Sequence, residues 1–93
     1  MYKRQALLGN LQFIANAQTD VSWGRTLTEA EYTVLTNAKI AVLNGGAQCG
    51  PGTWNPEFTT ETVRFSTLDA ANSYVATCNT LSPAPVSATA TAV

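Results

Sequence analysis

The side chains that most often carry catalysis or bind metals are scarce in this chain of 93 residues. Histidine is absent, which removes the commonest metal ligand and general base near neutral pH, so no Ser-His triad can form. Cys49 and Cys78 are too few and too widely spaced for a four-ligand zinc site. Glu29 and Glu31 fall on different faces of a helix, where they act as solvated first-turn charges rather than a catalytic pair. We therefore assign no catalytic, cofactor or metal residue, and the balance is against an enzyme.

The two cysteines have two interpretations. Cys78 lies on an apolar helical stripe, which is typical of a small core residue, whereas Cys49 lies in a glycine-rich loop. We favour two free thiols. The alternative is a disulfide between Cys49 and Cys78, which would tie the loop to the second helix and imply an oxidising compartment or a released particle.

Four side chains are candidates for contact with a partner or ligand. Trp54 and Phe58 lie close together beside a loop, and such aromatic residues can grip a partner. Arg64 could bind an anion, and Tyr74 flanks the second predicted helix. For each of them packing is the alternative, because large aromatic rings fill space in an alanine-rich core and a strand arginine usually faces solvent. We weigh packing above recognition at these positions.

Charge is sparse and slightly negative. Five Lys and Arg residues against six Asp and Glu residues give a formal net charge of −1. Because nucleic-acid binding relies on clustered Lys and Arg, we expect no nucleic-acid partner. No apolar run approaches the roughly 20 residues that cross a bilayer, so we expect no membrane partner either. The length suits one domain with a thin core.

The first five residues differ in character from the rest of the chain. Residues 1–5, MYKRQ, resemble a translated transposon-end adapter from sequencing libraries. That resemblance implies an environmental DNA source and native sequence from near Ala6, so that a single domain over residues 6–93 would lack its natural N-terminus. The alternative is a natural start at Met1. Residues 3–17 have the outline of a secretory signal, but polar residues interrupt its apolar region. The compartment stays open, and we expect a cytoplasmic or virion-associated protein rather than a secreted one.

The first half of the chain predicts a strand and a helix. Alternating apolar residues over 11–17 predict a strand, and residues 20–24 predict a turn with Trp23 at the edge of the core. A helix should begin after Thr26 or Thr28, each of which offers a capping box, and end at 44–46, where the sequence is Asn-Gly-Gly. We expect Glu31, Asn37 and Lys39 mainly outside. The expected buried positions are Leu27, Ala30, Val34, Ala38, Ala41 and Val42.

The second half predicts a strand, a helix and a strand. Residues 47–56 predict a loop with room for a short strand, and residues 58–65 a strand with Val63 and Phe65 on one side. Ser66 or Thr67 should cap a helix with Tyr74 on its flank. Residues 86–92 alternate alanine or valine with serine or threonine and predict a closing strand. The expected inward positions of the helix are Leu68, Ala71, Val75, Cys78 and Leu81.

Two β-α-β passages predict an α+β domain with a small sheet of three or four strands and two helices packed on one face. The expected topology is ferredoxin-like or split β-α-β. Residues 64–75, RFSTLDAANSYV, resemble the second-half helix entry of dimeric α/β-barrel families of ferredoxin-like topology. This resemblance implies a homodimer and a pocket, but it covers about a dozen residues and implies no particular activity.

Two classes of function follow. The first, which we prefer, is a structural or protein-interaction module, such as an accessory protein of an environmental phage or bacterium, whose sheet edge or open face mediates self-assembly. The second is a small ligand-binding protein or cofactor-independent enzyme of the dimeric α/β-barrel type, with a pocket between the sheet and the aromatic loop. A homodimer or a protein partner is expected, and no cofactor.

Overall fold

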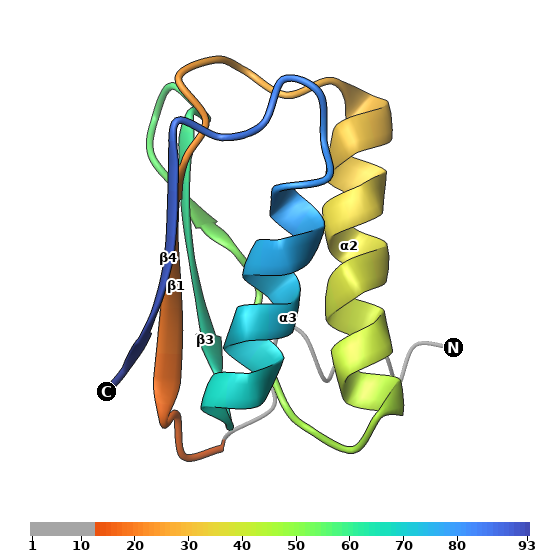
Figure 1. Ribbon diagram of the computed structural model, residues 1–93, viewed down its shortest axis with the longest axis vertical. Coiled ribbons are helices and arrows are strands. Elements are labelled where there is room, and N and C mark those ends of the chain that lie inside the picture. The colour runs from red at the N-terminus through yellow and green to blue at the C-terminus, as the bar shows by residue number, and fades with distance from the viewer. Residues whose placement is uncertain (1–12) are drawn as a thin grey trace.

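The structure, a computed structural model, describes residues 13–93 and consists of one sheet and one layer of helices (Figure 1). The sheet has the strand order β2-β3-β1-β4, and every neighbouring pair is antiparallel. Both helices cover the same face. The elements along the chain are β1 (Ala17–Ser22), α2 (Glu29–Asn44), β2 (Thr53–Trp54), β3 (Thr60–Phe65), α3 (Leu68–Cys78) and β4 (Ser87–Ala92).

This order confirms the predicted α+β class with four strands. β1 and β2 run parallel with β3 between them, and β3 and β4 run parallel with β1 between them. Each parallel pair is joined by a helix, so the chain forms two interleaved split β-α-β units, the ferredoxin-like arrangement. No helix in the described part of the chain is long and apolar enough to cross a membrane.

The predicted position of the first strand is wrong. Residues 11 and 12 lie outside the described residues, residues 13–16 form no regular strand, and β1 continues to Ser22 through the segment expected to turn. The alternation of apolar residues is interrupted at Thr19, a polar residue that is nevertheless fully buried on the helix side between Ala17 and Val21. Its Oγ1 donates a hydrogen bond to the Val63 carbonyl oxygen at 3.4 Å, which satisfies the buried hydroxyl.

The helix boundaries follow from capping. The second predicted register is the one used: Thr28 accepts a hydrogen bond from the Glu31 amide, and the Glu31 carboxylate accepts one from the Thr28 amide. α2 ends at Gly45, and Gly46 has φ +99°, a backbone angle that favours glycine. Thr67 caps α3 through a hydrogen bond from the Ala70 amide. The prediction of caps was therefore correct at Thr28 and Thr67.

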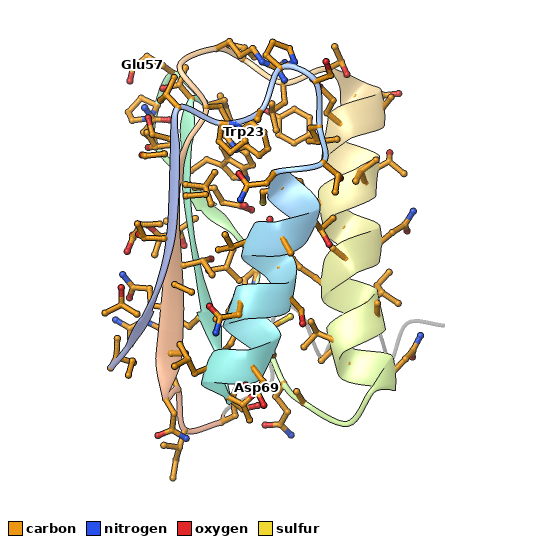
Figure 2. The ribbon with its side chains drawn as sticks, viewed as in Figure 1. Trp23, Glu57 and Asp69 are labelled. Atoms are coloured by element: carbon orange, nitrogen blue, oxygen red, sulfur yellow. The ribbon has the colours of Figure 1, made fainter. Side chains whose placement is uncertain are left out.

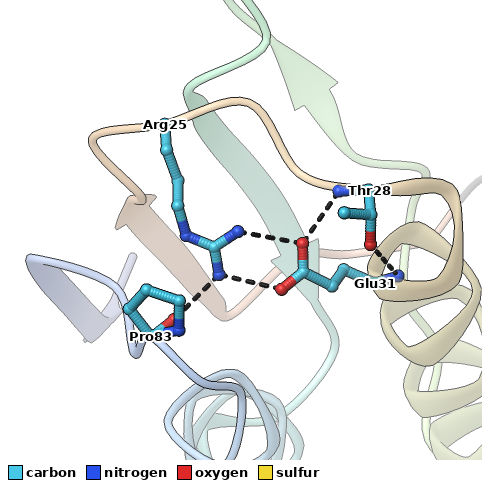
Figure 3. Close-up of polar contacts among 4 residues, drawn as sticks. All are labelled: Arg25, Thr28, Glu31 and Pro83. Atoms are coloured by element: carbon cyan, nitrogen blue, oxygen red, sulfur yellow. Dashed lines mark hydrogen bonds and ion pairs between the residues drawn. The ribbon is translucent and has the colours of Figure 1, made fainter.

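The sequence predicts Glu31 to be a solvated charge, and the structure shows that this prediction is wrong. Both of its oxygens accept hydrogen bonds from the Arg25 guanidinium, at 2.9 and 2.8 Å, and Arg25 also donates to the Pro83 carbonyl (Figure 3). These bonds from Arg25, with those from Thr28, lower the pKa of the Glu31 carboxyl to about 2. The contact joins the start of α2 to the loop between α3 and β4.

The predicted buried faces of the helices are only partly correct. Leu27 before α2, and Ala71 and Cys78 of α3, are buried as expected, but other positions differ. In α2 the buried residues are Leu35 and Lys39, while Ala30 and Ala41 are exposed. In α3 Leu68 is exposed, and Tyr74 is in the core rather than on its flank. Large side chains such as Leu35 and Tyr74 fill the space between helix and sheet that an alanine would leave empty. Lys39 can be buried because its ammonium pairs with the Glu61 carboxylate.

Trp23 lies deep in the core rather than at its edge. It is buried between the sheet and the helices near one end of the molecule (Figure 2). Within residues 13–93 its indole Nε1 has no hydrogen-bond partner, and the Arg25 guanidinium lies 5.8 Å from the centre of its ring. The ring thus contributes through apolar burial and a cation–π contact.

Candidate functional site

β4 is an edge of the sheet, and residues 13–93 leave its outer side unprotected. It pairs only with β1 among the described strands, and its six residues contain no charge, proline or glycine. Natural edge strands are usually blocked by charged residues, proline, bulges or a covering segment, because free backbone groups recruit other strands. Within residues 13–93, none of these features occurs in β4.

The hydrogen bonding identifies which backbone groups of β4 face outward. Val93 donates its N–H to the Asn16 carbonyl at 3.0 Å. In an antiparallel ladder a residue directs its N–H and C=O to the same side, and successive residues alternate. The odd-numbered residues of β4 therefore bond to β1. The residues whose N–H and C=O point away from the sheet are Ala88, Ala90 and Ala92.

The opposite edge is blocked. β2 has only two residues, and Pro51 and Pro56 lie on either side of it. The segment before β2 also pairs with the end of β3. The Gly50 amide donates to the Arg64 carbonyl at 3.0 Å, and the Ser66 amide donates to the Gln48 carbonyl at 2.8 Å. Short length and proline are the features that prevent strand addition. The two edges of the sheet are therefore unlike.

A second cluster of polar residues lies inside the core. The Lys39 ammonium is 2.9 Å from Glu61 Oε2, and the Tyr74 hydroxyl donates a hydrogen bond to Glu61 Oε1. Lys39 Nζ also lies 5.2 Å from the centre of the Tyr74 ring. All three side chains are nearly inaccessible to solvent. The cluster links α2, β3 and α3 at one point.

Burial makes the groups around this cluster poor nucleophiles or acids. It raises the pKa of Cys49 to about 11 and that of Cys78 to about 12. Burial and the neighbouring Glu61 carboxylate raise the pKa of Tyr74 well above its usual range. Cys49 and Cys78 are both free and fully buried. The arrangement holds the core together and offers no access for a substrate.

Sequence reasoning missed Glu61 and placed Lys39 outside. A signal for Glu61 was present, because it has the same parity as Val63 and Phe65, which were expected to face the core. No comparable signal existed for Lys39, since a lysine on a helix normally faces solvent.

The structure separates the four predicted contact residues. Trp54 is half-buried, packs edge-on against Tyr32 at 5.2 Å between ring centres, and lies 6.4 Å from Phe58. Phe58 is exposed and has φ 58°, in a turn where the Asn55 side chain accepts hydrogen bonds from two backbone amides. Tyr74 is in the core and Arg64 is on the opposite face of the sheet. Only Trp54 and Phe58 are brought together.

Arg64 lies beside a hollow on the open face of the sheet, the face that the helices leave uncovered. The hollow measures about 960 Å³ and is lined by parts of β1, β2 and β3 and by the segments before β1 and β2. Among the described residues Arg64 forms no ion pair. The Asp20 carboxylate on the same face accepts hydrogen bonds from Gln18 and Thr62. The lining residues are Phe13, Ala15, Gln18, Gly50, Pro51, Thr53, Thr62 and Arg64.

Comparison with known proteins finds no matching family model, curated protein or solved structure. Within residues 13–93, no group of three or more His, Cys, Asp or Glu side chains is placed to hold a metal ion. The fold and its surfaces are therefore the basis for any assignment of function.

Proposed function

We propose that this chain is a protein-interaction module that associates by adding a strand to the outer edge of β4. The observation that carries this proposal is the row of outward backbone groups at Ala88, Ala90 and Ala92 on an uncharged strand. Main-chain hydrogen bonds to an exposed edge are a common way to bind an extended segment.

The contrast between the two edges supports the proposal. The β2 edge has the features that prevent strand addition, whereas β4 offers six residues in an unbroken extended strand. The open face is a weaker candidate for a protein interface, because it presents mainly threonine, serine, glutamine and charged side chains. A core cluster closed to solvent argues against catalysis as the main role.

A synthetic peptide with the sequence of residues 86–93 provides a probe for strand addition. Added to isotope-labelled protein at millimolar concentration, it should shift the amide signals of Ala88, Ala90 and Ala92 and slow their hydrogen exchange. Shifts confined to the open face or to the helices, or no shift at all, would show that the proposal is wrong.

Two proline variants provide a matched pair for this test. Ala90→Pro removes an N–H that points away from the sheet, so the β1 to β4 ladder should survive and peptide binding should be lost. Thr89→Pro removes an N–H that faces Asp20 of β1, so it should lower the stability of the whole domain. If Ala90→Pro still bound the peptide as the wild type does, the binding edge would not be β4.

A small-ligand site at Arg64 is a second candidate function. The hollow of about 960 Å³ combines one guanidinium without an ion-pair partner in residues 13–93 with apolar surface from Phe13 and Pro51. This combination suits a small carboxylate with an apolar group. Such a site would fit the second class of function, a small ligand-binding protein or cofactor-independent enzyme of the dimeric α/β-barrel type.

Benzoate is a suitable probe for that candidate. It should shift the signals of Gln18, Thr62 and Arg64 in the wild type, and Arg64→Gln should remove these shifts while leaving the fold intact. Shifts that persist in Arg64→Gln would exclude a site built on this guanidinium. An accessory role in an environmental phage or bacterium is part of our first proposal, and the genes beside the uninterrupted reading frame would test it.

A further inference from the structure

We propose that the partner of β4 is a second copy of this chain, paired antiparallel about a two-fold axis at Ala90. This inference rests on the proposed function, because it names the segment that is added to the edge. It predicts an eight-stranded sheet that is continuous across the dimer, with both helix layers on the same side.

The alternation of β4 restricts the register of such a pair. Residues directly opposite in an antiparallel pair point their side chains to the same face of the sheet. In β4 the alanines face the helix layer and the threonines face the open side. A two-fold axis perpendicular to the sheet therefore has to pair alanine with alanine and threonine with threonine.

Every two-fold axis that passes through a residue of β4 meets this condition, and the two axes nearest the middle of the strand, at Thr89 and Ala90, give the longest pairings. The backbone groups distinguish these two registers. With the axis at Ala90, that residue pairs with itself and Ala88 pairs with the partner's Ala92, so all three outward-facing alanines are hydrogen bonded. With the axis at Thr89, Ala88 pairs with the partner's Ala90, and Ala92 is left opposite Val86. The first register gives hydrogen-bond partners within β4 to more of the outward N–H and C=O groups, and we adopt it.

Charge and exposure favour a copy of this chain as the occupant. Residues 70–93 contain no Lys, Arg, Asp or Glu, so two copies meet at the axis without repulsion between like charges. The side chains of β4 are alanine, threonine and serine, which are small enough for the two strands to approach along their whole length. Val86 and Val93 flank β4 and are 73% and 61% exposed, which places apolar surface at both ends of the shared edge.

Pairs of single-cysteine substitutions distinguish the registers. With the axis at Ala90, Thr89 lies opposite the partner's Thr91 as a non-hydrogen-bonded pair, with Cα atoms about 4.5 Å apart, a separation that a disulfide can span. A mixture of Thr89→Cys and Thr91→Cys proteins, exposed to copper and dissolved oxygen, should form the mixed disulfide faster than either protein forms its own. Thr36→Cys, at an exposed position of α2, is the control that gives the rate of disulfide formation by random collision. The buried native thiols should not react.

The mass of residues 1–93 in solution gives the second readout. Light scattering over increasing concentration should show the wild type passing from monomer to dimer while Ala90→Pro stays monomeric, with reductant making no difference. A wild type that stays monomeric at millimolar concentration, or cross-linking strongest for Thr89→Cys alone, would overturn this inference. In either case amide shifts caused by the 86–93 peptide would still support strand addition, so failure of the dimer and failure of the edge can be told apart.

Discussion

Lys39 of α2 and Glu61 of β3 form an ion pair of 2.9 Å between two almost completely buried side chains. The pair joins the helix layer to the sheet, and the Tyr74 hydroxyl of α3 engages the remaining carboxylate oxygen. Two charges removed from water are tolerated only when each has a partner, so each member of this cluster depends on the others.

Removal of one member of the pair should be strongly destabilising. Glu61→Gln leaves the Lys39 ammonium buried without a counter-ion, and we expect a loss of about 3–5 kcal/mol in the free energy of unfolding measured with urea. Lys39→Met should cost a similar amount. The double variant Lys39→Met with Glu61→Gln should recover part of the loss, and simple addition of the two single effects would contradict a coupled pair.

Gly52 and Gly50 should respond differently to alanine. A Cβ on Gly52 would overlap the Glu61 carboxylate, whereas a Cβ on Gly50 would meet nothing within 4 Å. Because Glu61 is held by Lys39, it cannot simply move aside, and Gly52→Ala should cost about 1–3 kcal/mol as an overpacked core does. Gly50→Ala should be nearly neutral. Equal urea midpoints for the two variants would show that the Glu61 carboxylate is free to move.

Glu31 should make stability depend on pH in acid. Its pKa in the folded protein is about 2 against an ordinary value of 4.5, because Arg25 and Thr28 donate hydrogen bonds to the ionised carboxylate. A lowered folded pKa contributes stability that is complete above pH 4.5 and is lost as the pH falls toward 2. The difference in urea midpoint between wild type and Glu31→Gln should therefore shrink over that range. Glu29→Gln, an exposed change in the same helical turn, removes one negative charge without touching the Arg25 contact and is the matched control variant.

The native thiols should react only when the domain opens. Cys49 and Cys78 are 0% exposed, and burial raises their pKa values to about 11 and 12. Ellman's reagent should therefore modify them far more slowly in the folded protein than in urea. A cysteine introduced at Thr36, which is exposed on α2, should react at once and serves as the control. Rapid modification of the native cysteines without denaturant would mean that the core around them opens readily.

The elements were predictable where local rules decide the structure. Thr28 and Thr67 cap helices because a hydroxyl can satisfy free amides, and Val63 and Phe65 face the core because a strand alternates. The errors arose where two elements compensate each other. Lys39 is buried only because Glu61 is buried opposite it. The sequence of the helix alone does not indicate that partner.

The candidate site was only partly predictable from the sequence. The alternation over residues 86–92 predicted the last strand, and a sheet edge was among the surfaces expected to mediate assembly. The strand order was not predictable, because the sequence of one strand does not indicate which other strands pair with it. The position of β4 at the edge, and the side to which the Ala90 backbone points, therefore became known only from the pairing with β1.

The central place of β1 determines how the domain can be divided. β1 is hydrogen bonded on one side to β3 and on the other to β4, so the second half of the chain supplies both of its neighbours. A cut in the loop between α2 and β2 would give a first fragment with a single strand and a second fragment whose β3 and β4 lack the strand between them. Neither fragment could build the four-stranded sheet alone, whereas the two mixed together could restore it by inserting β1 between β3 and β4. The domain is therefore one cooperative unit in which the last residues of β4 must be present before the first strand is fully paired.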